Sequence, residues 1–100
     1  MSPRQPRFSS HDALLDSKPW KTLDLHGFTE AEARGQVQKL VKLPAASGKV
    51  IHIITGKGKG SGGKAVLKTA VKGMLTGSMS ANVREWSLDS GDGGYRVLLR

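Results

Sequence analysis

The chain contains no cysteine, which excludes disulfides, thiolate metal sites and cysteine nucleophiles. Aromatic residues make up only 5% of it, so extensive stacking on bases and sequence-specific recognition are not expected. No apolar run approaches the roughly 18 residues of a spanning helix, and the amino end lacks the apolar segment of a secretory signal. We therefore expect a cytoplasmic protein without membrane contacts.

Acidic residues are also scarce, with 8 Asp and Glu against 16 Lys and Arg. The resulting net charge of +8 and the pI near 10.2 indicate an anionic partner, with nucleic acid favoured over membrane. Improved solubility is the alternative explanation of this charge. A length of 100 residues allows one domain with a two-layer core.

Composition divides the chain into a short arm and one domain. Residues 1–19 contain prolines, serines and the basic Arg4 and Arg7, which predicts a basic, flexible amino-terminal arm. Its charges would suit a phosphate backbone, and a plain solvated tail is the alternative. Order is expected to begin at Trp20, so that residues 20–100 form the folded domain.

Hydrophobic spacing predicts the element order β-α-β-α-β-β. Strands are expected at 22–26, 49–54, 82–88 and 95–100, a first helix after a capping box at Thr29, and a second helix at 65–75. The fold class is therefore α/β, a two-layer α/β sandwich. Its four-stranded mixed sheet has a parallel first pair, an antiparallel final hairpin and two helices on one face.

Each predicted helix has an apolar face. In the first helix this face consists of Ala33, Val37, Leu40 and Val41. In the second helix it consists of Val66, Leu67, Ala70, Val71, Met74 and Leu75, and the opposite face carries Lys64, Lys68 and Lys72. The second helix therefore presents a row of lysines to solvent.

A glycine-rich stretch follows the second strand, with glycine at five of the eight positions 56–63, interleaved with Lys57, Lys59 and Ser61. Glycine permits φ > 0 and close approach of a ligand, so that backbone N–H groups can converge on one phosphate. The start of the following helix would add its free N–H groups and dipole. This stretch is the predicted phosphate-binding loop.

The glycine stretch also partly matches two nucleotide-binding motifs. Residues 58–65 match a nucleoside-triphosphatase loop except that Ala65 replaces the Ser or Thr that holds magnesium. The glycines at 58–63, with Glu85 beyond them, also match a dinucleotide fingerprint, but that motif needs a larger sheet. We therefore expect no small-molecule nucleotide cofactor. A loop that grips a nucleic-acid phosphate agrees with the charge, and a tight turn with solvated lysines is the structural alternative.

Asp24 and His26 are the candidate catalytic pair. On a strand, residues i and i+2 share a face, so Asp24 can orient the imidazole, or both can touch one metal ion. Histidine can transfer a proton near neutral pH. A capped turn is the structural alternative for this pair. His52 is expected to be a core or near-core residue, and His11 has no assignable role.

Two motifs in this order and at this separation resemble the Smr (small MutS-related) domain: LDLHG at 23–27 and TGKG at 55–58. Further matches are Thr29, Glu32, Ala33, Ser61, Gly63, 65–68, Gly93, Gly94, Val97 and Leu99. The resemblance covers the chain from about Trp20 to its carboxyl end. It implies a two-layer α/β sandwich like the carboxyl-terminal domain of a bacterial translation initiation factor. It also implies nicking or cleavage of DNA, with some relatives acting on RNA.

The resemblance places Asp24 and His26 in the cleavage motif. It assigns a phosphate-gripping role to Thr55, Gly56, Lys57, Gly58 and Ser61. By their charge or position, four further residues of the loop and the second helix are expected to contribute: Lys59, Gly63, Lys64 and Lys68. Together with the five above, they form the predicted nucleic-acid-binding set. One departure is Gly60, which stands where many members carry His or Arg and which could weaken the activity.

The leading hypothesis is a stand-alone endonuclease that cuts DNA by phosphodiester hydrolysis. The alternative is a non-catalytic nucleic-acid-binding module, acting on RNA or at the ribosome. No cofactor is assigned, and the sequence leaves open whether Mg²⁺ or another divalent cation takes part. It also does not decide between DNA and RNA, or between monomer and oligomer.

Overall fold

The computed structural model describes residues 14, 18–56, 62–89 and 93–100, with the side chains of 62–65 outside this description. The strands are β1 (Lys21–Asp24), β2 (Val50–Ile54), β3 (Val83–Leu88) and β4 (Gly94–Leu99), and the helices are α2 (Glu30–Val41) and α3 (Gly62–Thr76). Short 3-10 helices occupy Pro44–Ala46 and Ser80–Asn82. The predicted element order is confirmed. Most of the predicted amino-terminal arm lies outside the described residues.

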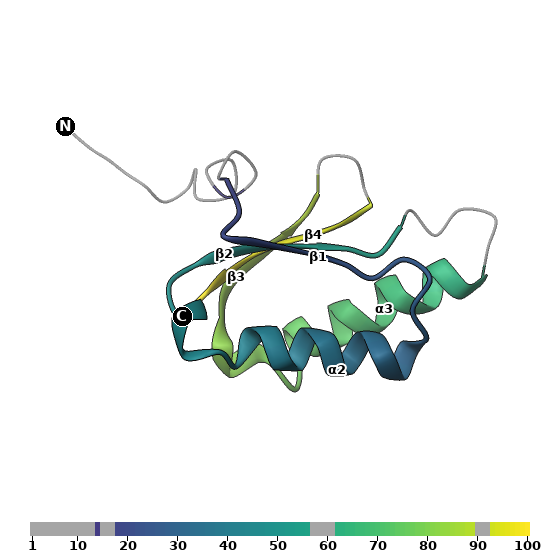
Figure 1. Cartoon of the computed structure of the whole chain (residues 1–100), viewed down its shortest axis with the longest axis horizontal. Coiled ribbons are helices and arrows are strands. Elements are labelled where there is room, and N and C mark those ends of the chain that lie inside the picture. Colours follow the sequence, from purple (N-terminus) through teal and green to yellow (C-terminus); the bar gives the residue numbers. More distant parts are fainter. Residues whose placement is uncertain (1–13, 15–17, 57–61, 90–92) are drawn as a thin grey trace.

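The four strands form one mixed sheet in the order β1-β2-β4-β3. β1 and β2 are parallel, whereas β4 is antiparallel to both β2 and β3. Both helices lie against the same face of the sheet, as Figure 1 shows. The predicted two-layer α/β sandwich is confirmed. None of the helices in the described part of the chain has the length and apolar character needed to span a bilayer.

The core lies between this face and the helices. β2 contributes Ile51 and Ile53, both fully buried, and its β-branched residues suit a central strand. α2 buries Ala33, Val37 and Val41, as the helical spacing predicted. Most of the buried hydrophobic residues form one cluster, which holds the sheet and the helices together.

The capping box that starts α2 is present. The Thr29 hydroxyl accepts a hydrogen bond from the Glu32 N–H at 3.2 Å, and the Glu32 carboxylate accepts one from the Thr29 N–H at 2.9 Å. These bonds satisfy donors that the first turn of a helix otherwise leaves open. The start of α2, and with it the length of the turn after β1, is therefore fixed locally.

Two details of the predicted elements are wrong. Val66 is exposed, because it faces a shallow hollow beside Glu30 and Arg34 of α2 and not the sheet. The first strand ends at Asp24 and not at His26, because the chain turns there and Gly27 takes a φ of 84°. His26 therefore lies in a turn and not on the strand.

Gly94 begins β4 at a point of very close contact with β2. A Cβ at Gly94 would overlap the carbonyl oxygen of Ile53 and would lie 3.0 Å from the Ile54 Cα. These are backbone atoms of the central strand, which cannot move aside without disturbing the sheet. The position therefore requires glycine for steric reasons.

We predict that Gly94→Ala lowers the free energy of unfolding by about 1–3 kcal/mol, because the methyl group overpacks the sheet. The matched control is Gly35→Ala in α2, where an added Cβ meets nothing within 4 Å. This control should raise stability by about 0.5–1 kcal/mol, since alanine favours the helix. Urea denaturation of both variants measures the two changes, and an unchanged midpoint for Gly94→Ala would contradict the steric argument.

Candidate functional site

The parallel pairing of β1 with β2 brings their carboxyl ends to one edge of the sheet. Asp24 is paired with Ile54, and the Leu25 N–H donates to the Ile54 carbonyl at 2.8 Å. The turn containing His26 and the segment that begins at Thr55 therefore leave the sheet side by side. Both helices also begin at this end of the molecule (Figure 1). The predicted parallel pairing of the first two strands is confirmed, and it is this pairing that makes their ends meet.

Asp24 holds both the backbone and the side chain of His26. Its Oδ1 accepts a hydrogen bond from the His26 N–H at 3.1 Å and lies 2.7 Å from His26 Nδ1. The first bond is typical of an aspartate-capped turn, and the second fixes the ring. The geometry thus combines a capped turn with an imidazole held by Asp24. The side chains are 49% exposed for Asp24 and 73% exposed for His26, so a ligand in solvent can reach them.

The charge of Asp24 determines which atom of His26 can react. The imidazole hydrogen bond first, and the His26 backbone N–H second, hold the pKa of the Asp24 carboxyl below its ordinary value of 3.8. At neutral pH the carboxylate therefore only accepts hydrogen bonds, and Nδ1 must carry the proton. In the neutral ring the lone pair is then on Nε2, which is the atom able to exchange a proton with a ligand.

The first residues of the glycine stretch are bound to the β3–β4 hairpin. The Gly93 carbonyl oxygen accepts hydrogen bonds from the N–H groups of Thr55 at 2.9 Å and of Gly56 at 3.0 Å. The buried Thr55 hydroxyl donates to the Gly56 carbonyl at 3.1 Å, and Gly56 turns the chain with a φ of 90°. In this structure the Gly56 N–H expected to contact a phosphate is thus already bonded within the protein. Thr55 and Gly56 shape the start of the loop.

The remaining predicted loop residues are described only in part. Lys57, Gly58, Lys59 and Ser61 lie outside the described residues. Gly63 and Lys64 belong to the first turn of α3, and Lys68 follows one turn later. This first turn contains no acidic residue, so nothing in it offsets the partial positive charge of the helix start.

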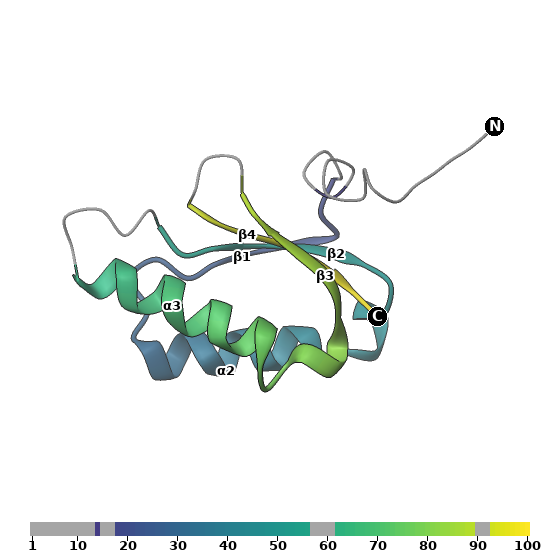
Figure 2. The same cartoon turned by 180° about the vertical axis from the view of Figure 1, so that it is seen from behind.

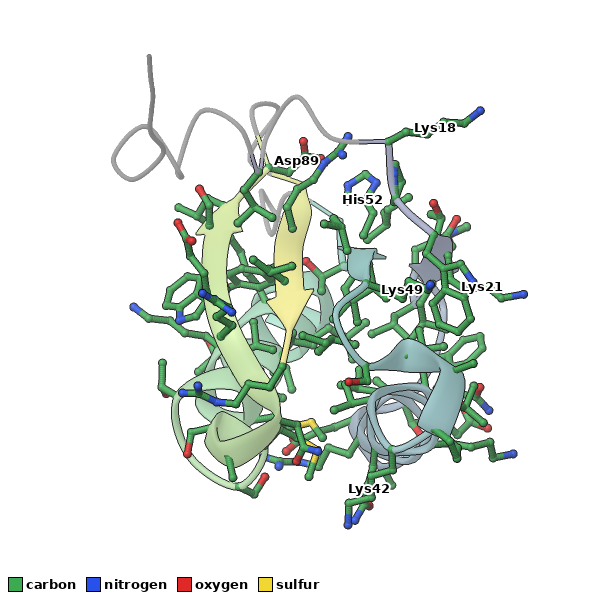
Figure 3. The ribbon with its side chains drawn as sticks, turned by 90° about the vertical axis from the view of Figure 1, so that its left-hand side faces the viewer. Lys18, Lys21, Lys42, Lys49, His52 and Asp89 are labelled. Atoms are coloured by element: carbon green, nitrogen blue, oxygen red, sulfur yellow. The ribbon has the colours of Figure 1, made fainter. Side chains whose placement is uncertain are left out.

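His52 forms a second pair with a residue that the sequence did not signal. Because Ile51 and Ile53 face the helices, His52 lies on the opposite face of the sheet, as Figure 3 shows. Its Nε2 is 3.0 Å from Asp89 Oδ2, and the two side chains are 16% and 22% exposed. The near-core position was expected, but a partner 37 residues later was not. This pair connects the central strand to the base of the β3–β4 hairpin.

Metal binding by the protein alone requires several His, Asp or Glu side chains that lie close together. No three His, Asp or Glu residues gather in the described ranges to form a metal site. Mg²⁺ is commonly held by one or two carboxylates together with phosphate oxygens and water. Asp24 fits this role in company with a bound phosphate, and none of the other described residues completes a closed site around it.

One family model matches most of the chain. The Smr domain matches residues 23–100, a range that contains the Asp24–His26 turn, the glycine stretch and the final hairpin. No curated protein and no solved structure matches the chain.

We predict that Asp24 titrates below 3.8 in the folded protein and that His26→Ala raises this pKa. The rise should be incomplete, because the backbone N–H of residue 26 still donates to the carboxylate. The stabilisation from this pair is present above pH 3.8 and is lost as the pH falls through the lowered pKa. Carboxyl ¹³C NMR titration of both proteins checks this, and equal pKa values would contradict it.

Proposed function

Because the chain belongs to the Smr domain family, we propose that it is an endonuclease that nicks or cleaves DNA by phosphodiester hydrolysis. Family membership indicates a nucleic-acid-binding protein, and some members are endonucleases. The observation that carries the proposal is the 2.7 Å contact of His26 Nδ1 with Asp24, at the strand end beside the glycine stretch.

In this proposal the glycine stretch positions the backbone of the nucleic acid. Lys57 and Lys59 supply positive charge, and the Gly58 N–H and the Ser61 hydroxyl supply donors. The start of α3 adds its unopposed dipole to the same place. The net charge of +8 attracts the polyanion and makes binding weaken as salt rises.

His26 performs the proton transfer. In the neutral ring, Nε2 takes a proton from the water whose oxygen attacks phosphorus; in the imidazolium, the Nε2–H gives its proton to the leaving oxygen. One P–O bond to water forms and one P–O bond to the leaving oxygen breaks. Asp24 keeps the ring in the required tautomer and stabilises the imidazolium. Asp24, together with phosphate oxygens, would hold Mg²⁺, which would neutralise part of the phosphate charge.

A non-catalytic nucleic-acid-binding module is the second candidate. Two observations favour it: the Asp24–His26 pair is open to water, and the Gly56 N–H is already bonded to Gly93. Gly60, in place of the His or Arg of many members, points the same way. Such a module would keep the salt-dependent binding and give no product.

We predict that His26→Ala lowers the nicking of supercoiled plasmid by about 10²-fold or more, the usual contribution of a general acid or base. Asp24→Asn should also lower it, because the tautomer is no longer fixed. Conversion of supercoiled to open-circular plasmid, with and without Mg²⁺, measures the rate. Matched DNA and RNA substrates at two salt concentrations identify the preferred nucleic acid.

His11→Ala is the matched control, because it removes a histidine to which no role is assigned. It should leave the rate unchanged. Equal nicking by wild type and His26→Ala would remove His26 from the mechanism. Salt-sensitive binding without any product from the wild type would establish the binding module instead.

A further inference from the structure

A cleft of about 320 Å³ lies between α3 and β3 and shares only Lys68 with the site described above. Figure 2 shows these two elements on the same side of the molecule. Its volume is at the lower end of the range for small-ligand pockets. Its walls come from three elements and consist of Lys68, Thr69 and Lys72 of α3, Trp86 and Leu88 of β3, and Tyr95 of β4.

The aromatic side of the cleft is held in place. The rings of Trp86 and Tyr95 meet edge to face, with centroids 5.6 Å apart and planes at 73°. Tyr95 is buried, and its hydroxyl donates to the Lys68 carbonyl at 3.0 Å. This bond ties α3 to β4 beside the cleft, so the indole lines a preformed surface.

The other side of the cleft is basic. Lys68 and Lys72 are four residues apart and therefore lie on one side of α3. Leu88, at the end of β3, is 45% exposed, so a ligand in the cleft can reach its side chain. An indole and a leucine beside two ammonium groups suit a ligand that is flat and aromatic at one end and anionic at the other. A nucleotide has this chemistry.

The sheet register places the cleft and the Asp24–His26 turn at opposite edges of the sheet but at the same level along the strands. Leu23, Ile53, Tyr95 and Leu88 form one row across the four strands, and Asp24 directly follows Leu23. Three strand spacings of ~4.8 Å put Leu88 on the order of 14 Å from the first strand. A few nucleotides of one strand cover that distance, passing the start of α3.

We propose that this cleft binds one unpaired base of the nucleic acid, with Trp86 and Leu88 against the base and Lys68 and Lys72 beside its phosphates. The substrate class is then single-stranded nucleic acid, or a duplex with unpaired nucleotides, because paired bases are stacked inside a duplex and cannot reach a protein cleft. The inference rests on nucleic-acid binding in the proposed function and does not require cleavage. The scarcity of aromatic residues predicted little stacking overall, but one base needs only one indole.

The test uses the fluorescence of Trp86. Trp20→Phe in the full chain leaves Trp86 as the sole tryptophan. An end-labelled single-stranded oligonucleotide and a duplex of equal length are titrated at fixed salt, with anisotropy of the label reporting binding. We expect the single strand to bind more tightly and to quench Trp86, and the duplex to leave the fluorescence unchanged.

Substitutions in the cleft provide a second readout. Lys72→Gln should weaken single-strand binding and reduce the slope of log K against log salt by about one. Lys42→Gln is the matched control, because Lys42 is an exposed lysine at the carboxyl end of α2. It should leave the affinities for the single strand and for the duplex near the wild-type values. Trp86→Leu, with its fold checked by circular dichroism, should weaken single-strand binding roughly tenfold.

The outcomes separate this inference from the proposed function. Absence of any anisotropy change with either oligonucleotide would overturn both. Binding of both oligonucleotides with unquenched Trp86, or with equal quenching by the duplex, would overturn the cleft assignment and leave the proposed function standing. An equal loss of single-strand affinity in Lys72→Gln and Lys42→Gln would also overturn the cleft assignment.

Discussion

The parallel pairing of β1 with β2 is the constraint on which the candidate site depends. Its last hydrogen bond, from the Leu25 N–H to the Ile54 carbonyl, sets the points at which both following segments leave the sheet. Because parallel strands end at the same edge, a carboxylate and an imidazole from one segment leave the sheet beside the other segment at Thr55 and Gly56, where the glycine stretch begins. An antiparallel pairing of these strands would have placed them at opposite edges.

The β3–β4 hairpin supports this edge from the other side. Gly93 accepts the N–H groups of both Thr55 and Gly56, and Gly94 lets β4 approach β2 closely enough for this. The His52–Asp89 pair holds the base of the same hairpin to the central strand. Glycines that are far from the glycine stretch in sequence therefore determine how that stretch begins, while His26 is held by a local turn.

The candidate proton-transfer pair and the basic residues are distributed differently in this molecule. The proton-transfer candidate is a small exposed pair, Asp24 and His26, whereas lysine and arginine occur along the whole sequence, five of the lysines in the glycine stretch and α3. Electrostatic attraction to a polyanion acts over several ångströms and needs no precise geometry, but proton transfer does. Under the proposed function, the presence or absence of proton transfer at this one imidazole would separate a nuclease from a module that only binds.

Local patterns in the sequence determined the element order, the capping box at Thr29, the buried faces of the helices and the Asp24–His26 pair, because each depends on residues within about one turn or one strand. The helical periodicity placed Val66 in the core, but Val66 faces the hollow beside α2. The strand alternation extended β1 to His26, but the hydrogen bond from the His26 N–H to Asp24 turns the chain before that residue. Tertiary structure alone decided that Asp89 meets His52, that Gly93 takes the donors of Thr55 and Gly56, and that Trp86, Leu88 and Lys72 share one cleft. These contacts join residues far apart in sequence, and the pairing of strands in the sheet, with the packing of α3 against it, brings them together.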